Sequence, residues 1–162
     1  MRRIGFKIIG ILAVMFLVSI SNETLCNASA MDVEIEPYSD GSYAIITTGE
    51  MDSDMLNATT HLSSSTITKS KTYTYYSSSG VAQYMITLTG KYKYGNGSAT
   101  CTSASVSVVV YNSGWRCSFK SANCSGNTAY GTVNINRIVN GKVTVTHSKS
   151  LSLTCSSSGV FS

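Results

Sequence analysis

The stretch VAQYMITLTGKYKY, residues 81–94, decides the fold class of this 162-residue chain. Its even positions carry large apolar or aromatic side chains, which are Tyr84, Ile86, Leu88, Tyr92 and Tyr94. Its odd positions are mostly polar. An apolar side chain at every second residue is typical of a β-strand with one buried face. We therefore expect the tyrosines to point inward, Lys91 and Lys93 to point outward, and Gly90 to mark a bulge.

The same alternation recurs on both sides of this segment, and short turns rich in glycine, serine or asparagine separate the repeats. Expected strands cover residues 67–76, 81–94, 98–111, 115–120, 128–139 and 142–155. No helical period stands out, and no proline occurs after Pro37. Strands with one apolar face each require two packed sheets. The sequence predicts an all-β, antiparallel sandwich of about six to seven strands.

The hairpin at Asn140-Gly141 allows two registers. A two-residue turn pairs Ile138 with Val143, but it sets Ile135 opposite Thr146 and mixes apolar and polar side chains on each face. A three-residue loop aligns the apolar residues better. Turn chemistry and hydrophobic pattern differ by one residue, so both registers stay open.

Residues 1–30 have the pattern of a secretory signal peptide. Basic residues precede the apolar run 8–20, and Ala28-Ser29-Ala30 offers a cleavage site after about Ala30. The apolar run has 13 residues, whereas a membrane-spanning helix needs about 20. We expect the mature protein to be secreted and to have no membrane span.

Cleavage there leaves four cysteines: Cys101, Cys117, Cys124 and Cys155. An even number in an exported chain predicts two disulfides, for which three pairings exist. A zinc site is the rival explanation, but no Cys-x₂₋₄-Cys spacing occurs among them. We expect no metal and no cofactor.

Charge divides the mature chain into two parts. Seven acidic and no basic residues lie between residues 31 and 55, whereas the remainder carries nine basic and no acidic residues. Pro37, Asp40-Gly41 and Gly49 interrupt the acidic part. We expect residues 31–65 to form a flexible acidic leader and residues 66–162 the folded domain. The alternative is that the leader docks on the basic domain.

A folded domain without Asp or Glu lacks the groups that most acid–base catalysis requires. Neither His61 nor His147 has an acidic partner inside the domain, and no Gly-x-Ser-x-Gly motif occurs. We expect His147 to be a half-exposed strand residue. We also expect no enzyme, unless a leader carboxylate lies beside one of the histidines.

The distinctive surface content of the domain is lysine and tyrosine. The candidate binding surface consists of Lys69, Lys71, Tyr73, Tyr75, Lys91 and Lys93. Such a surface suits an anionic envelope polymer, a glycan or a surface protein. It lacks the density of arginine and lysine that nucleic acid requires. The hypothesis is a secreted, non-catalytic binding module. The alternatives are a toxin-like effector activated by removal of the acidic leader, and a self-assembling extracellular protein.

Two resemblances add to this interpretation. Cys101, Trp115 and Cys155 stand as Cys-x₁₃-Trp-x₃₉-Cys, which resembles the spacing in immunoglobulin domains. That resemblance implies an immunoglobulin-like sandwich with Cys101–Cys155 paired, and leaves Cys117 to pair with Cys124. It also requires a bulge between Thr102 and Ser105 to keep both faces apolar.

The segment 73–162 is also similar to small exported β-rich proteins of Gram-positive bacteria, a group with no assigned activity. The strings that carry this likeness are YYSSSG, ATCTSAS, SGNTA and the ending LSLTC. The likeness implies an exported β-protein and no catalytic residue.

Overall fold

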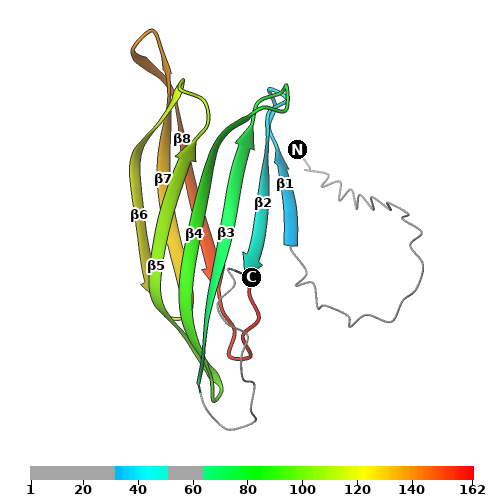
Figure 1. Cartoon of the computed structure of the whole chain (residues 1–162), viewed down its shortest axis with the longest axis vertical. Helices are drawn as coiled ribbons and strands as arrows, with labels where there is room; N and C mark the ends of the chain where they lie inside the picture. The colour runs from blue at the N-terminus through cyan, green and yellow to red at the C-terminus, as the bar shows by residue number, and fades with distance from the viewer. Residues whose placement is uncertain (1–31, 51–63) are drawn as a thin grey trace, which may run out of the picture.

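The computed structural model describes residues 32–50 and 64–162, which form two antiparallel sheets. The first sheet has five strands in chain order: β1 (Asp32–Pro37), β2 (Tyr43–Glu50), β3 (Ser65–Tyr76), β4 (Ala82–Gly95) and β5 (Ser98–Val110). The second sheet has three: β6 (Trp115–Ser125), β7 (Thr128–Val139) and β8 (Lys142–Thr154). The all-β, two-sheet expectation is confirmed, with eight strands instead of six or seven (Figure 1).

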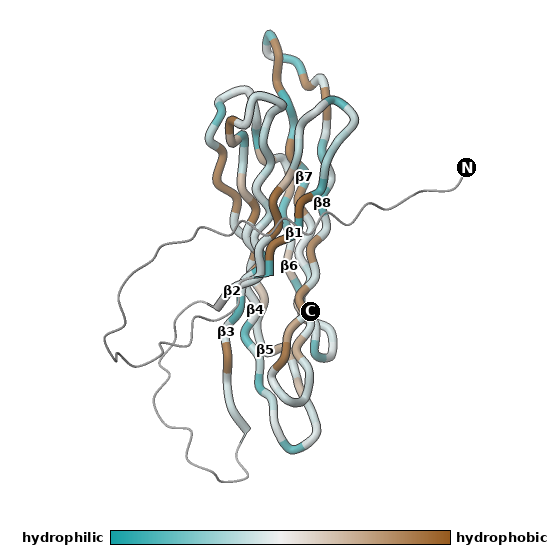
Figure 2. Tube along the Cα trace, turned by 90° about the vertical axis from the view of Figure 1, so that its right-hand side faces the viewer, coloured by the Kyte–Doolittle hydropathy of each residue, from teal (hydrophilic) through white to brown (hydrophobic). Residues whose placement is uncertain are grey.

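The core lies between the two sheets. It contains tyrosine and aliphatic side chains of β3 and β4 on one side and aliphatic side chains of β7 and β8 on the other. The largest fully buried members are Tyr73, Tyr84, Tyr92, Ile86, Leu88, Ile135, Leu153 and Val133. The alternation predicted for residues 81–94 is confirmed, because Tyr92 is buried and Lys91 and Lys93 are exposed. Apolar and polar residues follow one another along the strands in Figure 2.

Two further strands come from the acidic segment that we expected to be flexible. β1 pairs with β2, and β2 pairs with β3, so residues 32–50 extend the sheet at its edge. Asp40-Gly41 lies in the turn between β1 and β2, where Gly41 has a φ of 81°. Pro37 ends the ladder of β1, where its missing N–H costs least. The expectation of a flexible leader is wrong for these residues, and residues 51–63 of that segment lie outside the described part of the chain.

Four bulges adjust the registers of the described strands, and two of them bear on the expectations from the sequence. Lys91 pairs with Ser103 and Tyr92 with Cys101, so Thr102 is the extra residue in β5, within the stretch where a bulge was expected. A second bulge in β8 resolves the register of the Asn140-Gly141 hairpin. The two-residue turn pairs Ile138 with Val143, and the register then shifts so that Ile135 faces His147 instead of Thr146. The structure therefore contains both the two-residue turn and the apolar alignment that is offset from it by one residue.

The predicted disulfide pairing is wrong. The bond joins Cys101 in β5 to Cys124 in β6, and the thiols of Cys117 and Cys155 are free. Because β6 continues unbroken from Cys117 through Cys124, these two residues lie roughly 20 Å apart at about 3.3 Å per residue. Cys155 follows β8, which β7 separates from β6. The bond instead crosses between the neighbouring edges of the two sheets.

Candidate functional site

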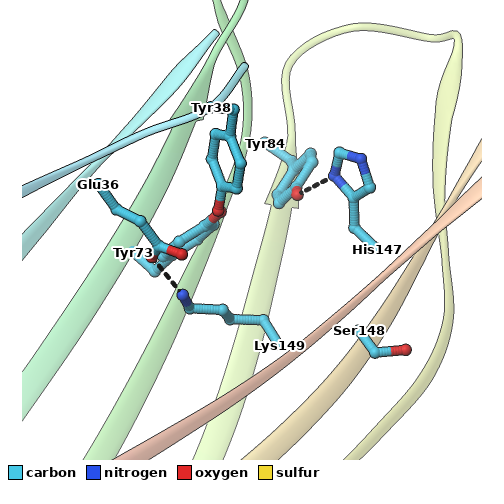
Figure 3. Close-up of a pocket in the computed structure, with 7 residues that line it drawn as sticks. All are labelled: Glu36, Tyr38, Tyr73, Tyr84, His147, Ser148 and Lys149. Atoms are coloured by element: carbon cyan, nitrogen blue, oxygen red, sulfur yellow. Dashed lines mark hydrogen bonds and ion pairs between the residues drawn. The ribbon is translucent and has the colours of Figure 1, made fainter. Parts of the chain in front are cut away.

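The two sheets are held together at one side and form a cleft near the other. Besides the disulfide, the Cys101 N–H donates a hydrogen bond of 2.8 Å to the Gly126 carbonyl on the β5–β6 side. The cleft, of about 220 Å³, lies where β8 approaches β1 and β3. We call it the tyrosine cleft, and its lining residues are Glu36, Tyr38, Tyr73, Tyr84, His147, Ser148 and Lys149 (Figure 3).

Strand alternation brings these side chains together. Residues opposite one another in a sheet point to the same face. Glu36 pairs with Ala44, and Ala44 pairs with Tyr75, so Glu36 lies on the inner face of the five-stranded sheet. On β8, His147 and Lys149 have the parity of the buried Leu151 and Leu153. Both side chains therefore point toward the other sheet.

The phenol groups of the cleft are linked by hydrogen bonds. The Tyr38 and Tyr73 hydroxyls lie 2.7 Å apart, and the Tyr84 hydroxyl lies 2.8 Å from Nδ1 of His147. Behind them, the Tyr75 hydroxyl donates a hydrogen bond of 2.9 Å to Oγ of Ser42. These contacts fix the rings, so the cleft presents polar groups at defined positions.

Lys149 supplies the positive charge of the cleft. Its Nζ forms an ion pair with the Glu36 carboxylate and lies 4.5 Å from the centroid of the Tyr73 ring. The two charged side chains keep 23% and 37% of their surface exposed, for Lys149 and Glu36 respectively. The ammonium is thus held by a ring and a carboxylate and still reaches solvent.

Aromatic rings form the wall behind the cleft. The ring of His147 lies 4.8 Å from that of Trp115 and 5.1 Å from that of Tyr75, measured between centroids. Tyr75 and Tyr84 stack at 5.2 Å. The guanidinium carbon of Arg137 lies over the Trp115 ring, 5.9 Å from its centroid. This packing gives the wall a rigid apolar surface with polar atoms at its rim.

Burial sets the protonation states in the cleft. It raises the pKa of Tyr73 and of Tyr84 far above the ordinary value, so both phenols stay protonated at physiological pH. Burial lowers the pKa of His147; the Asp40 carboxylate opposes that effect and Arg137 adds to it. The cleft therefore contains neutral hydrogen-bonding groups beside one ion pair.

The sequence-predicted binding residues lie on two opposite faces. Tyr73 and Tyr75 are buried on the inner face, and Lys69 and Lys71 share their parity on β3. Lys91 and Lys93 lie on the outer face of β4. Only Tyr73 of the predicted set lines the tyrosine cleft. The six residues do not form one surface.

Sequence analysis does not identify Glu36, Tyr38 or Lys149. Its expectation that His147 is a half-exposed strand residue is confirmed, but it gives this residue no role in a site. A signal for two of them is present, because His147 and Lys149 continue the odd-numbered apolar series of Leu151 and Leu153. The position of Glu36 follows from the pairing of β1 with β2 and of β2 with β3. That pairing brings an acidic residue into the cleft that also contains His147.

Within residues 32–50 and 64–162, no group of three histidine, cysteine or acidic side chains has the arrangement of a metal site. The same residues include no helix that is long and apolar enough to cross a membrane. The chain matches no protein-family model, no curated protein and no solved structure. Its function must therefore be argued from the cleft.

Proposed function

We propose that this protein is a secreted, non-catalytic binding module that holds a sugar unit of an envelope glycan in the tyrosine cleft. The observation that carries the proposal is the combination of fixed phenols, a neutral imidazole and one ammonium around a space of about 220 Å³. Sugars offer many hydroxyls and an apolar ring face. Phenols and lysine provide the matching hydrogen bonds, and aromatic rings provide the apolar contact.

The size of the cleft supports a small ligand unit. Drug-sized ligands occupy pockets of about 300 to 1,000 Å³, and this cleft is smaller. It suits one ring, such as the end or a side branch of a glycan. A long polymer would need a groove, so the rest of such a ligand would extend from the cleft into solvent.

The chemistry of the cleft argues for binding over catalysis. The raised pKa of Tyr73 and of Tyr84 makes these phenols poor bases and poor nucleophiles. Glu36 lines the cleft with His147, but its carboxylate pairs with Lys149, while His147 bonds Tyr84. Glycosidases typically require two carboxyl groups that face the bond to be cleaved, and Glu36 is the one carboxylate among the lining residues.

A titration of the oxidised protein with short glycans tests the proposal. Trp115 packs against His147 and gives a fluorescence readout near the cleft. Replacing Tyr38, which is 38% exposed, by alanine should weaken binding about tenfold, the effect of losing roughly 1.4 kcal/mol. The matched control is Tyr111→Ala, because Tyr111 is an exposed tyrosine outside the cleft. Equal affinities of the two variants, or no binding of any glycan, would reject the proposal.

One observation favours the self-assembling alternative. β1 is an edge strand, and its outward side chains Val33 and Ile35 are 54% and 63% exposed. An apolar edge of this kind can pair with a strand of another copy. Sedimentation of the wild type and of Ile35→Lys across a range of concentrations tests it, since only the wild type should associate.

A further inference from the structure

Edge strand β1 is the weakest part of the tyrosine cleft. It pairs with β2 alone, and its apolar side chains Val33 and Ile35 face outward. Its inward series is Asp32, Glu34 and Glu36, which adds no apolar side chain to the core. β1 is therefore held by its backbone ladder and by polar contacts, and it can shift without opening the core.

The main polar contact between β1 and the other sheet is that of Glu36 with Lys149. The carboxylate of Glu36 lies on the ammonium group, beside the face of Tyr73. The Tyr38 hydroxyl bonds the Tyr73 hydroxyl, and the Glu36 charge adds to the burial that raises the pKa of Tyr38. A carboxylate thus occupies a position bounded by one ammonium and by phenol groups, as Figure 3 shows.

This position is open to exchange. Both partners of the ion pair are partly exposed, and exposed ion pairs contribute little stability. A carboxylate on a ligand can form the same charge-assisted contact with Lys149. The Glu36 side chain would then turn out to solvent, which its place on an edge strand permits.

We propose that Lys149, with Tyr38 and Tyr73, forms a carboxylate-binding subsite in which Glu36 is a built-in substitute for the ligand. The inference rests on the proposed sugar-binding function and specifies its ligand as an acidic sugar, such as a hexuronic acid. A carboxylate fits better than a phosphate monoester. The subsite offers one positive charge, and the group already seated there carries a single negative charge.

Competition by Glu36 has a defined consequence for affinity. A ligand carboxylate must displace Glu36. Its apparent affinity is therefore the intrinsic affinity multiplied by the fraction of molecules in which Lys149 is not paired with Glu36. Replacing Glu36 by glutamine keeps the shape of the side chain but weakens its hold on Lys149. The variant should bind an acidic sugar more tightly than the wild type does.

Titrations with glucuronic acid and with glucose, which differ in the carboxylate, test the subsite in four proteins. These are the wild type, Glu36→Gln, Lys149→Met and the control Glu34→Gln, which changes an acidic residue of the same face and strand. We expect Glu36→Gln to bind glucuronic acid roughly three- to tenfold more tightly and Glu34→Gln to match the wild type. Lys149→Met should lose the preference for glucuronic acid over glucose.

The outcomes separate the two proposals. Binding of both sugars with equal affinity in all four proteins would overturn the carboxylate subsite and leave the sugar-binding function standing. Weaker binding of glucuronic acid by Glu36→Gln would also overturn the subsite, because Glu36 would then assist the ligand. If no protein binds either sugar or any longer glycan, the proposed function fails and the subsite fails with it.

Discussion

The ring of Tyr92 lies against Gly90, in the space that a side chain at position 90 would need. A β-carbon built on Gly90 would stand 2.6 Å from two ring carbons of Tyr92 and closer still to its hydroxyl oxygen. The ring cannot move aside easily, since its hydroxyl donates a hydrogen bond of 2.6 Å to the Leu153 carbonyl across the core. Gly90 therefore allows a tyrosine to connect the two sheets.

Replacing Gly90 by alanine should lower the free energy of unfolding by about 1 to 3 kcal/mol, the usual cost of overpacking a core. The control is Gly49→Ala, because a β-carbon at Gly49, also in a strand, meets no atom within 4 Å. Urea denaturation of both variants measures the difference. Equal stability of the two would show that the Tyr92 ring has room to move.

The hydroxyl of Tyr92 supplies a second test of the same contact. Burial raises the pKa of Tyr92 to about 12. Tyr92→Phe removes the donor to the Leu153 carbonyl and should cost about 1 to 2 kcal/mol. Alkaline titration followed by ultraviolet absorbance should lose a late-ionising phenol in this variant. Loss of a phenol that titrates near the ordinary value of 10 would contradict the burial of the hydroxyl.

The disulfide can be tested by chemical mapping. Digestion without reduction should release a fragment that joins the peptides of Cys101 and Cys124, with Cys117 and Cys155 open to alkylation after unfolding. Cys101→Ser should cost about 3 kcal/mol, because the bond closes a loop with a sequence separation of 23. Cys117→Ser is the control and should leave stability nearly unchanged. A fragment that joins Cys101 to Cys155 would contradict the structure.

Local patterns in the sequence predicted the strands of the folded domain well. Alternation depends on which residues face the core, and that choice is already decided within one strand such as β4. Residues 32–37 show the same alternation, in which Asp32, Glu34 and Glu36 alternate with Val33 and Ile35. Their high charge favours a flexible segment, whereas the alternation and the Asp40-Gly41 turn favour the hairpin of β1 and β2 that the structure shows.

Local sequence patterns could not predict the features that depend on contacts between distant parts of the chain. The disulfide depends on which sheet edges meet, and strands β5 and β6 meet because a short turn carries the chain from one sheet to the other. The tyrosine cleft likewise combines β1, β3, β4 and β8. No single stretch contains the pairing of Glu36 with Lys149, so sequence analysis found one lining residue, Tyr73, and assigned it to a different surface.

The half-buried imidazole of His147 should make stability depend on pH. Its pKa is lowered by burial and by Arg137, against the opposing effect of Asp40, while the uncharged rings of Tyr75, Tyr84 and Trp115 contact it. In the unfolded chain the imidazole has an ordinary pKa of about 6.5. Below that pH it binds a proton in the unfolded chain more readily than in the folded protein. The free energy of unfolding should therefore fall as the pH drops from about 7 toward the lowered pKa.

Replacing His147 by glutamine removes the titrating group and keeps a side chain that can bond the Tyr84 hydroxyl. The variant should lose the part of the pH dependence between about pH 5 and 7 that belongs to this residue, whereas the wild type should retain it. Urea unfolding at four or five pH values in that window measures both proteins. If their slopes are equal, the imidazole takes up its proton as readily in the folded chain as in the unfolded one. The aromatic wall would then be open to water, and a cleft with such a wall would be a weaker site for the apolar face of a sugar.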